Sequence, residues 1–301
     1  MIHSPRGAHI FLFISAVING ANYSFAKNVM PTFIQPSGII VIRGICTIFT
    51  FWLLDLAFGD KKPIERKDWK QLFFCAVTGI FINQLFFYNG LNYTTPIHAA
   101  LMMLMAPFII LLISVFIVKE SIAILQLSGL LLACLGAGWL ILGKDIGSIG
   151  GSNIVLGDTL VFINAVSWGI FTVIVRPLVL KYNVFSLLKW IFFTGFFMIL
   201  PFGLNDVLDI QWNTFTPIAG YSLAFLIVFG TILAYALNTY FLKFLSPVVA
   251  GSYAYLQPVT AAIFSLWMGK EVLTLEKVGC AGVILVGLFL LNKGKSKKQN
   301  D

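Results

Sequence analysis

Amide, phenol and indole side chains recur at helical spacing inside long apolar stretches of this sequence. Ser15, Asn19 and Asn22, for example, share one helical stripe at positions i, i+4 and i+7. Polar side chains in apolar segments usually face a bundle interior or a water-filled cavity, because contact with hydrocarbon is unfavourable. We therefore expect a central cavity that binds a small molecule. Its candidate lining residues are Asn19, Asn22, Gln84, Tyr88, Met103, Asn164, Trp168, Tyr235, Asn238, Tyr255 and Gln257.

The chemistry of this candidate lining is neutral. The acidic residues Asp55, Glu120, Asp158 and Glu271 all lie at the ends of apolar stretches. Such a pocket suits neutral, zwitterionic or aromatic solutes, and it lacks the Lys and Arg clusters that polyphosphates require. Proton-driven carriers usually use carboxylates or histidines within the membrane. The sequence therefore favours facilitated movement down a gradient, or coupling through an acid at a span end.

A structural role is the alternative for each polar residue. Asn, Gln and Ser often join helices by hydrogen bonds worth roughly 0.6–2 kcal/mol each, with no ligand involved. Met102, Met103 and Met105 cannot all face one side of a helix, so at most two line the cavity, and packing explains them equally well.

Arg43 is the formal charge that lies clearly inside an apolar stretch. Its side chain can snorkel outward, pair with Asp158, or bind a substrate carboxylate. Lys27 and His98 lie near span ends and are expected to form part of an outer vestibule. His98 has no second His or acidic residue at ligand spacing, so we expect no metal site.

Pro107 and Pro258 lie in the middle of apolar stretches. Each removes a backbone hydrogen bond and clashes with the preceding turn, so each bends its helix. We interpret the two prolines as a pair of hinges that gate the cavity; static kinks that shape it are the alternative.

The elements that must position these residues are transmembrane helices. The chain has 301 residues, of which 59% are hydrophobic and 11% charged, whereas a soluble domain has about 25% charged residues. A helix needs about 20 apolar residues to cross a bilayer. The expected fold is an all-α integral membrane protein with ten transmembrane helices, over approximately 8–29, 37–58, 71–91, 97–118, 122–142, 155–176, 185–204, 217–242, 248–269 and 277–292.

The basic residues predict the orientation. With alternating sides, fifteen Lys and Arg residues of the connecting segments fall on the side of the N-terminus and four on the opposite side. Cytoplasmic loops are enriched in Lys and Arg, so both termini are expected in the cytoplasm. The net charge of +8 then reflects topology, with membrane lipid and not nucleic acid as the partner of the basic tail.

An internal repeat divides the chain. Residues 93–120 align with 244–271 without a gap, at a constant offset of 151. The matched pairs include Pro96 with Pro247, Ala99 with Ala250, Pro107 with Pro258, Ser114 with Ser265, Lys119 with Lys270, Glu120 with Glu271 and, further out, Gly79 with Gly230. We predict two halves of five helices, 1–146 and 147–301. An odd number of spans places the second copy upside down, which is typical of secondary transporters with a midplane site between the halves.

The pattern resembles the EamA-like exporters of the drug/metabolite transporter superfamily over nearly the whole chain. The similarity rests on Ala99, Pro107, Glu120, Gly129 and Gly136 of the first copy, on Ala250, Pro258, Glu271, Gly282 and Gly287 of the second, and on Arg43 and Trp168-Gly169. Asn19 departs from it, because the family commonly has Trp before Gly20. The resemblance implies a ten-helix exporter of small metabolites, amino acids among them, in a bacterial inner membrane.

Other functional classes remain open on the sequence. A multidrug or cationic-compound efflux carrier and a small-solute channel are alternatives, as is a receptor or scaffold. We expect no enzyme activity and no cofactor, because no nucleophile–base pair, metal cluster or nucleotide-binding loop occurs in the sequence. Small residues in 122–142 and 277–292 permit close helix packing, either within a monomer or in a homodimer.

Overall fold

The computed structural model describes residues 5–60, 62–118, 124–142, 152–269 and 274–296. These residues are helical wherever they are regular, and the described residues of each of the ten predicted segments are mainly helical. Lys119, Glu120, Lys270 and Glu271 lie outside the described residues. The helices are α1 (Pro5–Val29), α2 (Pro36–Phe58), α3 (Trp69–Ala76), α4 (Asn83–Tyr93), α5 (Pro96–Met103), α6 (Ala106–Val118), α7 (Ile124–Leu142), α8 (Ile154–Lys181), α9 (Val184–Leu208), α10 (Pro217–Ile227), α11 (Ala234–Phe241), α12 (Pro247–Ser252), α13 (Gln257–Trp267) and α14 (Leu275–Ser296).

Within the described residues, seven helical stretches are long and apolar enough to cross a membrane. They start at Ala8, Pro36, Arg66, Pro96, Ile154, Val184 and Pro217. Their outer faces expose large apolar side chains such as Phe49 and Leu56, at 65% and 81% of their surface. Exposed apolar surface on this scale needs hydrocarbon around it, so the fold is that of a multi-pass membrane protein.

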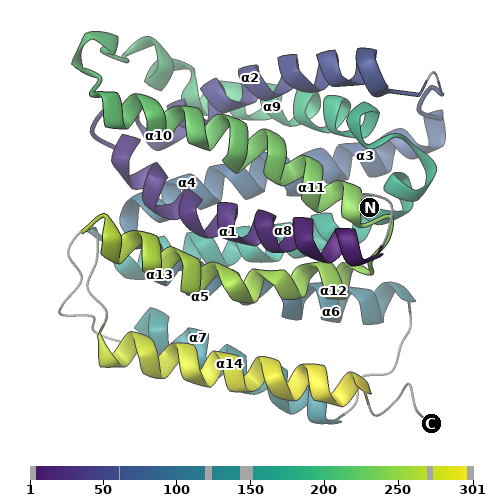
Figure 1. Cartoon of the computed structure of the whole chain (residues 1–301), viewed down its shortest axis with the longest axis vertical. Coiled ribbons are helices and arrows are strands. Elements are labelled where there is room, and N and C mark those ends of the chain that lie inside the picture. The colour runs from purple at the N-terminus through teal and green to yellow at the C-terminus, as the bar shows by residue number, and fades with distance from the viewer. Residues whose placement is uncertain (1–4, 61, 119–123, 143–151, 270–273, 297–301) are drawn as a thin grey trace.

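Helices of the first half (5–142) pack mainly on helices of the second half (152–296). α2 lies beside α9 at one edge of the bundle, and α7 pairs with α14 at the opposite edge (Figure 1). Between these edges, α4 packs on α8 while α1 packs on α10, α11 and α13. The two halves therefore share one apolar core.

Two of the predicted spans contain a π-helical turn at matching places. One covers Val77–Ile82, between α3 and α4, and the other covers Val228–Leu233, between α10 and α11. The two are 151 residues apart, which is the offset of the sequence repeat. A π-turn widens the helix and leaves backbone carbonyls without their usual partners, and such turns are frequent at functional sites.

Two other spans are broken just before the repeated prolines. α5 ends at Met103 and α6 begins at Ala106, while α12 is followed by the 3₁₀ turn Tyr253–Leu256 and then by α13. Pro107 and Pro258 are thus the second residues of α6 and α13, where a missing N–H costs little. At each site a short stretch with 3₁₀-type hydrogen bonds separates the two α-helices, so the α-helical pattern is interrupted just before the proline.

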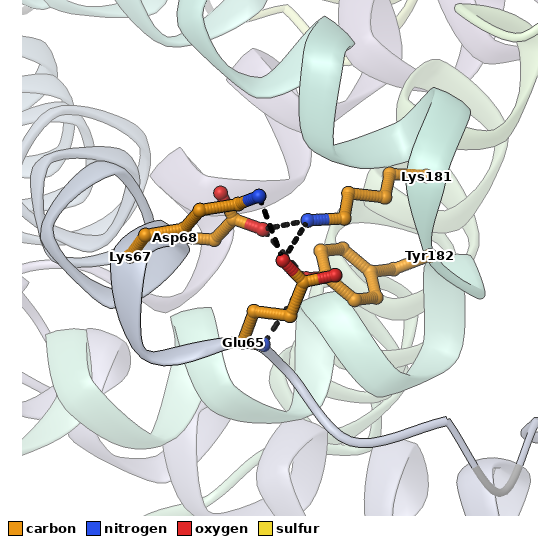
Figure 2. Close-up of polar contacts among 5 residues, drawn as sticks. All are labelled: Glu65, Lys67, Asp68, Lys181 and Tyr182. Atoms are coloured by element: carbon orange, nitrogen blue, oxygen red, sulfur yellow. Dashed lines mark hydrogen bonds and ion pairs between the residues drawn. The ribbon is translucent and has the colours of Figure 1, made fainter.

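A network of charged side chains joins the segment before α3 to the end of α8. Figure 2 shows Lys181 between two carboxylates, with its Nζ atom 2.8 Å from Glu65 Oε2 and 2.5 Å from Asp68 Oδ2. The Tyr182 hydroxyl donates to Asp68 Oδ2 at 2.6 Å and accepts from the Glu65 amide at 3.1 Å. Mainly because Lys181 donates to it, the pKa of Glu65 is lowered. A second cross-half contact pairs Asp55 of α2 with Lys189 of α9.

Candidate functional site

A central cavity of about 100 Å³ lies between the two halves. Its walls come from α1, α2, α4, α5, α8, α11 and α13, from the π-turn before α11, and from α12 with the 3₁₀ turn that follows it. Ten of the eleven residues predicted to line a cavity do line this one: Asn19, Asn22, Gln84, Tyr88, Met103, Asn164, Trp168, Tyr235, Asn238 and Gln257. No Asp or Glu contributes to its lining within the described residues.

Tyr255 is the predicted residue that lies elsewhere. It belongs to the 3₁₀ turn and packs against the main apolar core. From the 3₁₀ turn, Tyr253 and Ala254 line the cavity, while Tyr255 does not. Among the three methionines, Met103 lines the cavity.

Gln84 and Tyr235 form the polar centre of the cavity. Gln84 Nε2 donates to Tyr235 Oη at 2.8 Å, and the Tyr235 hydroxyl lies 2.8 Å from the Gly79 carbonyl oxygen, to which it donates. The Gly79 carbonyl belongs to the first π-turn. Asn83 Oδ1 lies 3.0 Å from the same hydroxyl. These bonds fix the Tyr235 ring in the cavity wall.

Aromatic rings surround Tyr235. Trp168 stands perpendicular to its ring, with centroids 5.5 Å apart, and Phe192 approaches edge-on at 4.9 Å. Edge-to-face pairs of this kind are favourable and geometrically specific. Trp168 is half-buried and lines the cavity, so it offers an aromatic face to a solute.

The opposite wall is built from α1. Asn22 Nδ2 contacts Tyr88 Oη at 3.4 Å, and the Tyr23 hydroxyl donates to Gln257 Oε1 at 3.0 Å. Tyr23 and Asn83 are lining residues that the helical pattern did not identify. Asn83 follows directly on the π-turn, and α-helical spacing does not direct two consecutive residues, 83 and 84, to one face.

Arg43 contributes to the cavity lining from α2 and is 2% exposed, so it does not snorkel outward. Its Nε atom donates to Thr231 Oγ1 at 2.6 Å and its Nη2 atom to the Gly230 carbonyl at 3.3 Å. The guanidinium also lies over the Tyr88 ring, 4.5 Å from its centroid. Gly230 and Thr231 belong to the second π-turn.

Asp158 does not pair with Arg43, contrary to one of the alternatives above. Its Oδ2 atom lies 2.8 Å from His98 Nδ1, and its Oδ1 atom accepts from the Thr94 hydroxyl at 2.5 Å. All three residues are fully buried. His98 is therefore part of a sealed contact between α5 and α8 and not of an open vestibule. Lys27 is half-buried and donates to the Asn92 carbonyl at 3.2 Å.

A bundle of apolar helices around a polar cavity shared by two repeated halves is the architecture of a membrane transporter. The sequence comparison identifies the family. A model of the EamA-like transporter family matches residues 6–142 and 155–293, once in each half. The chain belongs to this family, within the drug/metabolite transporter superfamily.

Relatives are similar over nearly their full length. The uncharacterized transporter YyaM of Bacillus subtilis is 23% identical over 97% of both chains, and an uncharacterized transporter of Archaeoglobus fulgidus is 25% identical over 87% of this chain and 89% of its own. A crystal structure superimposes with a TM-score of 0.67 at 16% identity, covering 95% of this chain and 96% of that chain. This last similarity concerns the fold alone.

Proposed function

We propose that the chain is a secondary transporter that exports small neutral, zwitterionic or aromatic metabolites, such as amino acids, by alternating access. One observation supports this proposal above the others. Amide, phenol and indole groups from both halves meet in one cavity without an acidic residue among the described lining. A cavity between two repeats is where secondary transporters bind their solutes.

The spans that begin with α5 and α12 differ in burial. This difference supports a state in which the cavity is closed at one end of the bundle. All eight residues of α5 are buried. In α12, the equivalent of α5 in the second half, Val248, Val249, Ala250 and Gly251 are partly exposed. Ala250 and Gly251 also line the cavity. The cavity thus extends toward the end where α12 starts and is sealed at the end where α5 starts.

Alternating access follows if the halves exchange these arrangements. In this proposal the ten helical segments all span the membrane, the second repeat is inverted, and both termini lie in the cytoplasm of a bacterial cell. The sealed end of α5 then faces outward and the cavity faces the cytoplasm. An exporter in this state is ready to accept a solute from inside.

Counterflow in proteoliposomes tests the transport function. Vesicles with purified protein are loaded with one unlabelled amino acid, and entry of the labelled solute is followed without a pH gradient. Saturable counterflow is the expected result; flux that rises linearly with solute concentration would indicate the channel alternative. Strict dependence on an imposed pH gradient would contradict uncoupled transport.

Alanine substitutions test the cavity. Gln84→Ala, Trp168→Ala, Tyr235→Ala, Asn238→Ala and Gln257→Ala should each lower counterflow far more than Phe49→Ala, whose ring is 65% exposed on the outer face. Unchanged flux in all five variants would show that this cavity is not the solute path.

A further inference from the structure

Arg43 is a buried cation that pairs with no carboxylate among the residues that the structure describes. Among the described residues, no carboxylate lies within ion-pair distance of its guanidinium, whose contacts are Thr231, the Gly230 carbonyl and the Tyr88 ring. Its Nη1 atom has no hydrogen-bond partner. A charge inside a membrane protein is costly and is normally paired or placed on the path of a substrate or ion.

Two other residues that line the cavity also carry polar atoms without partners. Asn22 Oδ1 is buried without a hydrogen bond and lies beside Gly230, because a Cβ atom on that glycine would be 2.3 Å from it. Asn164 Oδ1, in another wall of the same cavity, is likewise buried and without a partner. Buried polar atoms usually have hydrogen-bond partners. These atoms are covered in this state of the cavity, so a solute can supply the missing partners once the cavity opens further.

We propose that Arg43 binds a single carboxylate of the transported solute, and that the free amide oxygens of Asn22 and Asn164 accept hydrogen bonds from its donor groups. This inference rests on the proposed function and narrows its substrate class to solutes with one carboxylate, zwitterions above all. A guanidinium recognises carboxylates through charge-assisted hydrogen bonds. It also repels cations, which disfavours the cationic-drug alternative.

The contact of Arg43 with Thr231 allows a role in solute binding to be distinguished from a purely structural role. Through Nε the side chain also holds Thr231 of the second π-turn. If this bridge were its whole role, Thr231→Val would have the same effect as Arg43→Gln. If the charge binds the solute, Thr231→Val keeps the preference for a carboxylate and Arg43→Gln loses it.

The experiment measures counterflow of the standard amino acids first, and then competition by matched analogues of every amino acid that is transported. The analogues are its amide, which keeps the ammonium, and its decarboxylated amine. For wild type we expect the acid to compete at least about tenfold better than either analogue, the effect of one hydrogen bond to a charged group. Arg43→Gln should reduce this ratio to near one, Arg43→Lys should keep part of it, and Thr231→Val should keep it.

The outcomes are distinguishable. If no amino acid shows saturable counterflow with wild type, the proposed function itself fails. If transport occurs but amides and amines compete as well as acids, or if folded Arg43→Gln keeps the preference, only the role of Arg43 is overturned. Should Arg43→Gln not fold, the wild-type ratio together with Arg43→Lys still decides the question.

Discussion

Gln84 and Tyr235 occupy equivalent positions in the two repeats, 151 residues apart, and hydrogen bond to each other at 2.8 Å. Each residue lies in a different match of the family model, so their contact is one between the two halves. This contact therefore marks the place where the two halves meet, and it lies in the wall of the cavity. The π-turns flank it, with Gly79 accepting from Tyr235 and Gly230 from Arg43. Each π-turn glycine thus gives its carbonyl to a side chain of the other half.

We predict that Tyr235→Phe weakens solute affinity and lowers stability by about 1–3 kcal/mol, because the Gln84 donor and the Gly79 carbonyl both lose their partner. Counterflow and thermal unfolding in detergent measure the two effects. Tyr221→Phe is the control, since that side chain is 76% exposed. In a double-mutant cycle, Gln84→Ala and Tyr235→Phe should be coupled by about 0.5–3 kcal/mol. Additive effects would mean that the bond contributes nothing of its own.

The helix breaks before Pro107 and Pro258 give a second prediction. Alanine at either position restores an N–H and permits a continuous helix across the break. We expect Pro107→Ala and Pro258→Ala to lower the transport rate severalfold while changing the free energy of unfolding by less than about 1 kcal/mol. Pro217→Ala is the matched control, because Pro217 is the first residue of α10 and does not interrupt a span. Full transport in the double variant Pro107→Ala with Pro258→Ala would show that the interruptions only shape the cavity and do not gate it.

The sequence alone predicted the helical segments and most of the cavity lining, because both depend on local periodicity. An amide every three or four residues in an apolar stretch identifies an inward face whatever the neighbours are. Asn83 was missed, and Tyr255 was wrongly placed in the lining, where the backbone departs from α-helical spacing through a π-turn and a 3₁₀ turn. The partner of Asp158 was missed for another reason. His98 lies 60 residues away, and a contact between distant helices has no local signal.

The His98–Asp158 pair seals the end of the bundle where α5 begins, and it gives a third prediction. Both side chains are fully buried, and leaving a buried polar group without its hydrogen-bond partner costs about 1–3 kcal/mol. We expect His98→Ala to lower the free energy of unfolding by this amount, and the double variant His98→Leu with Asp158→Leu to recover part of it. His9→Ala is the control, since His9 is exposed and its side chain hydrogen bonds to Tyr253. An equal loss in the two single histidine variants would show that burial of the pair is unimportant.

The charged network of Figure 2 gives a pH-dependent prediction. Because Lys181 lowers the pKa of Glu65 in the folded chain, the native state binds this proton less readily than the unfolded state does. The resulting stabilisation is complete above the ordinary glutamate pKa of about 4.3 and is lost as the pH falls through the lower, folded-state value. We expect the melting temperature of wild type to decline in this acidic range, and that of Lys181→Gln to decline less steeply from a lower starting value. Lys67→Gln should have a smaller effect, since Lys67 donates to the same carboxylate from a side chain that is 74% exposed. Parallel melting curves for wild type and Lys181→Gln across this range would mean that the contacts of Lys181 with Glu65 and Asp68 do not hold α8 to the segment before α3.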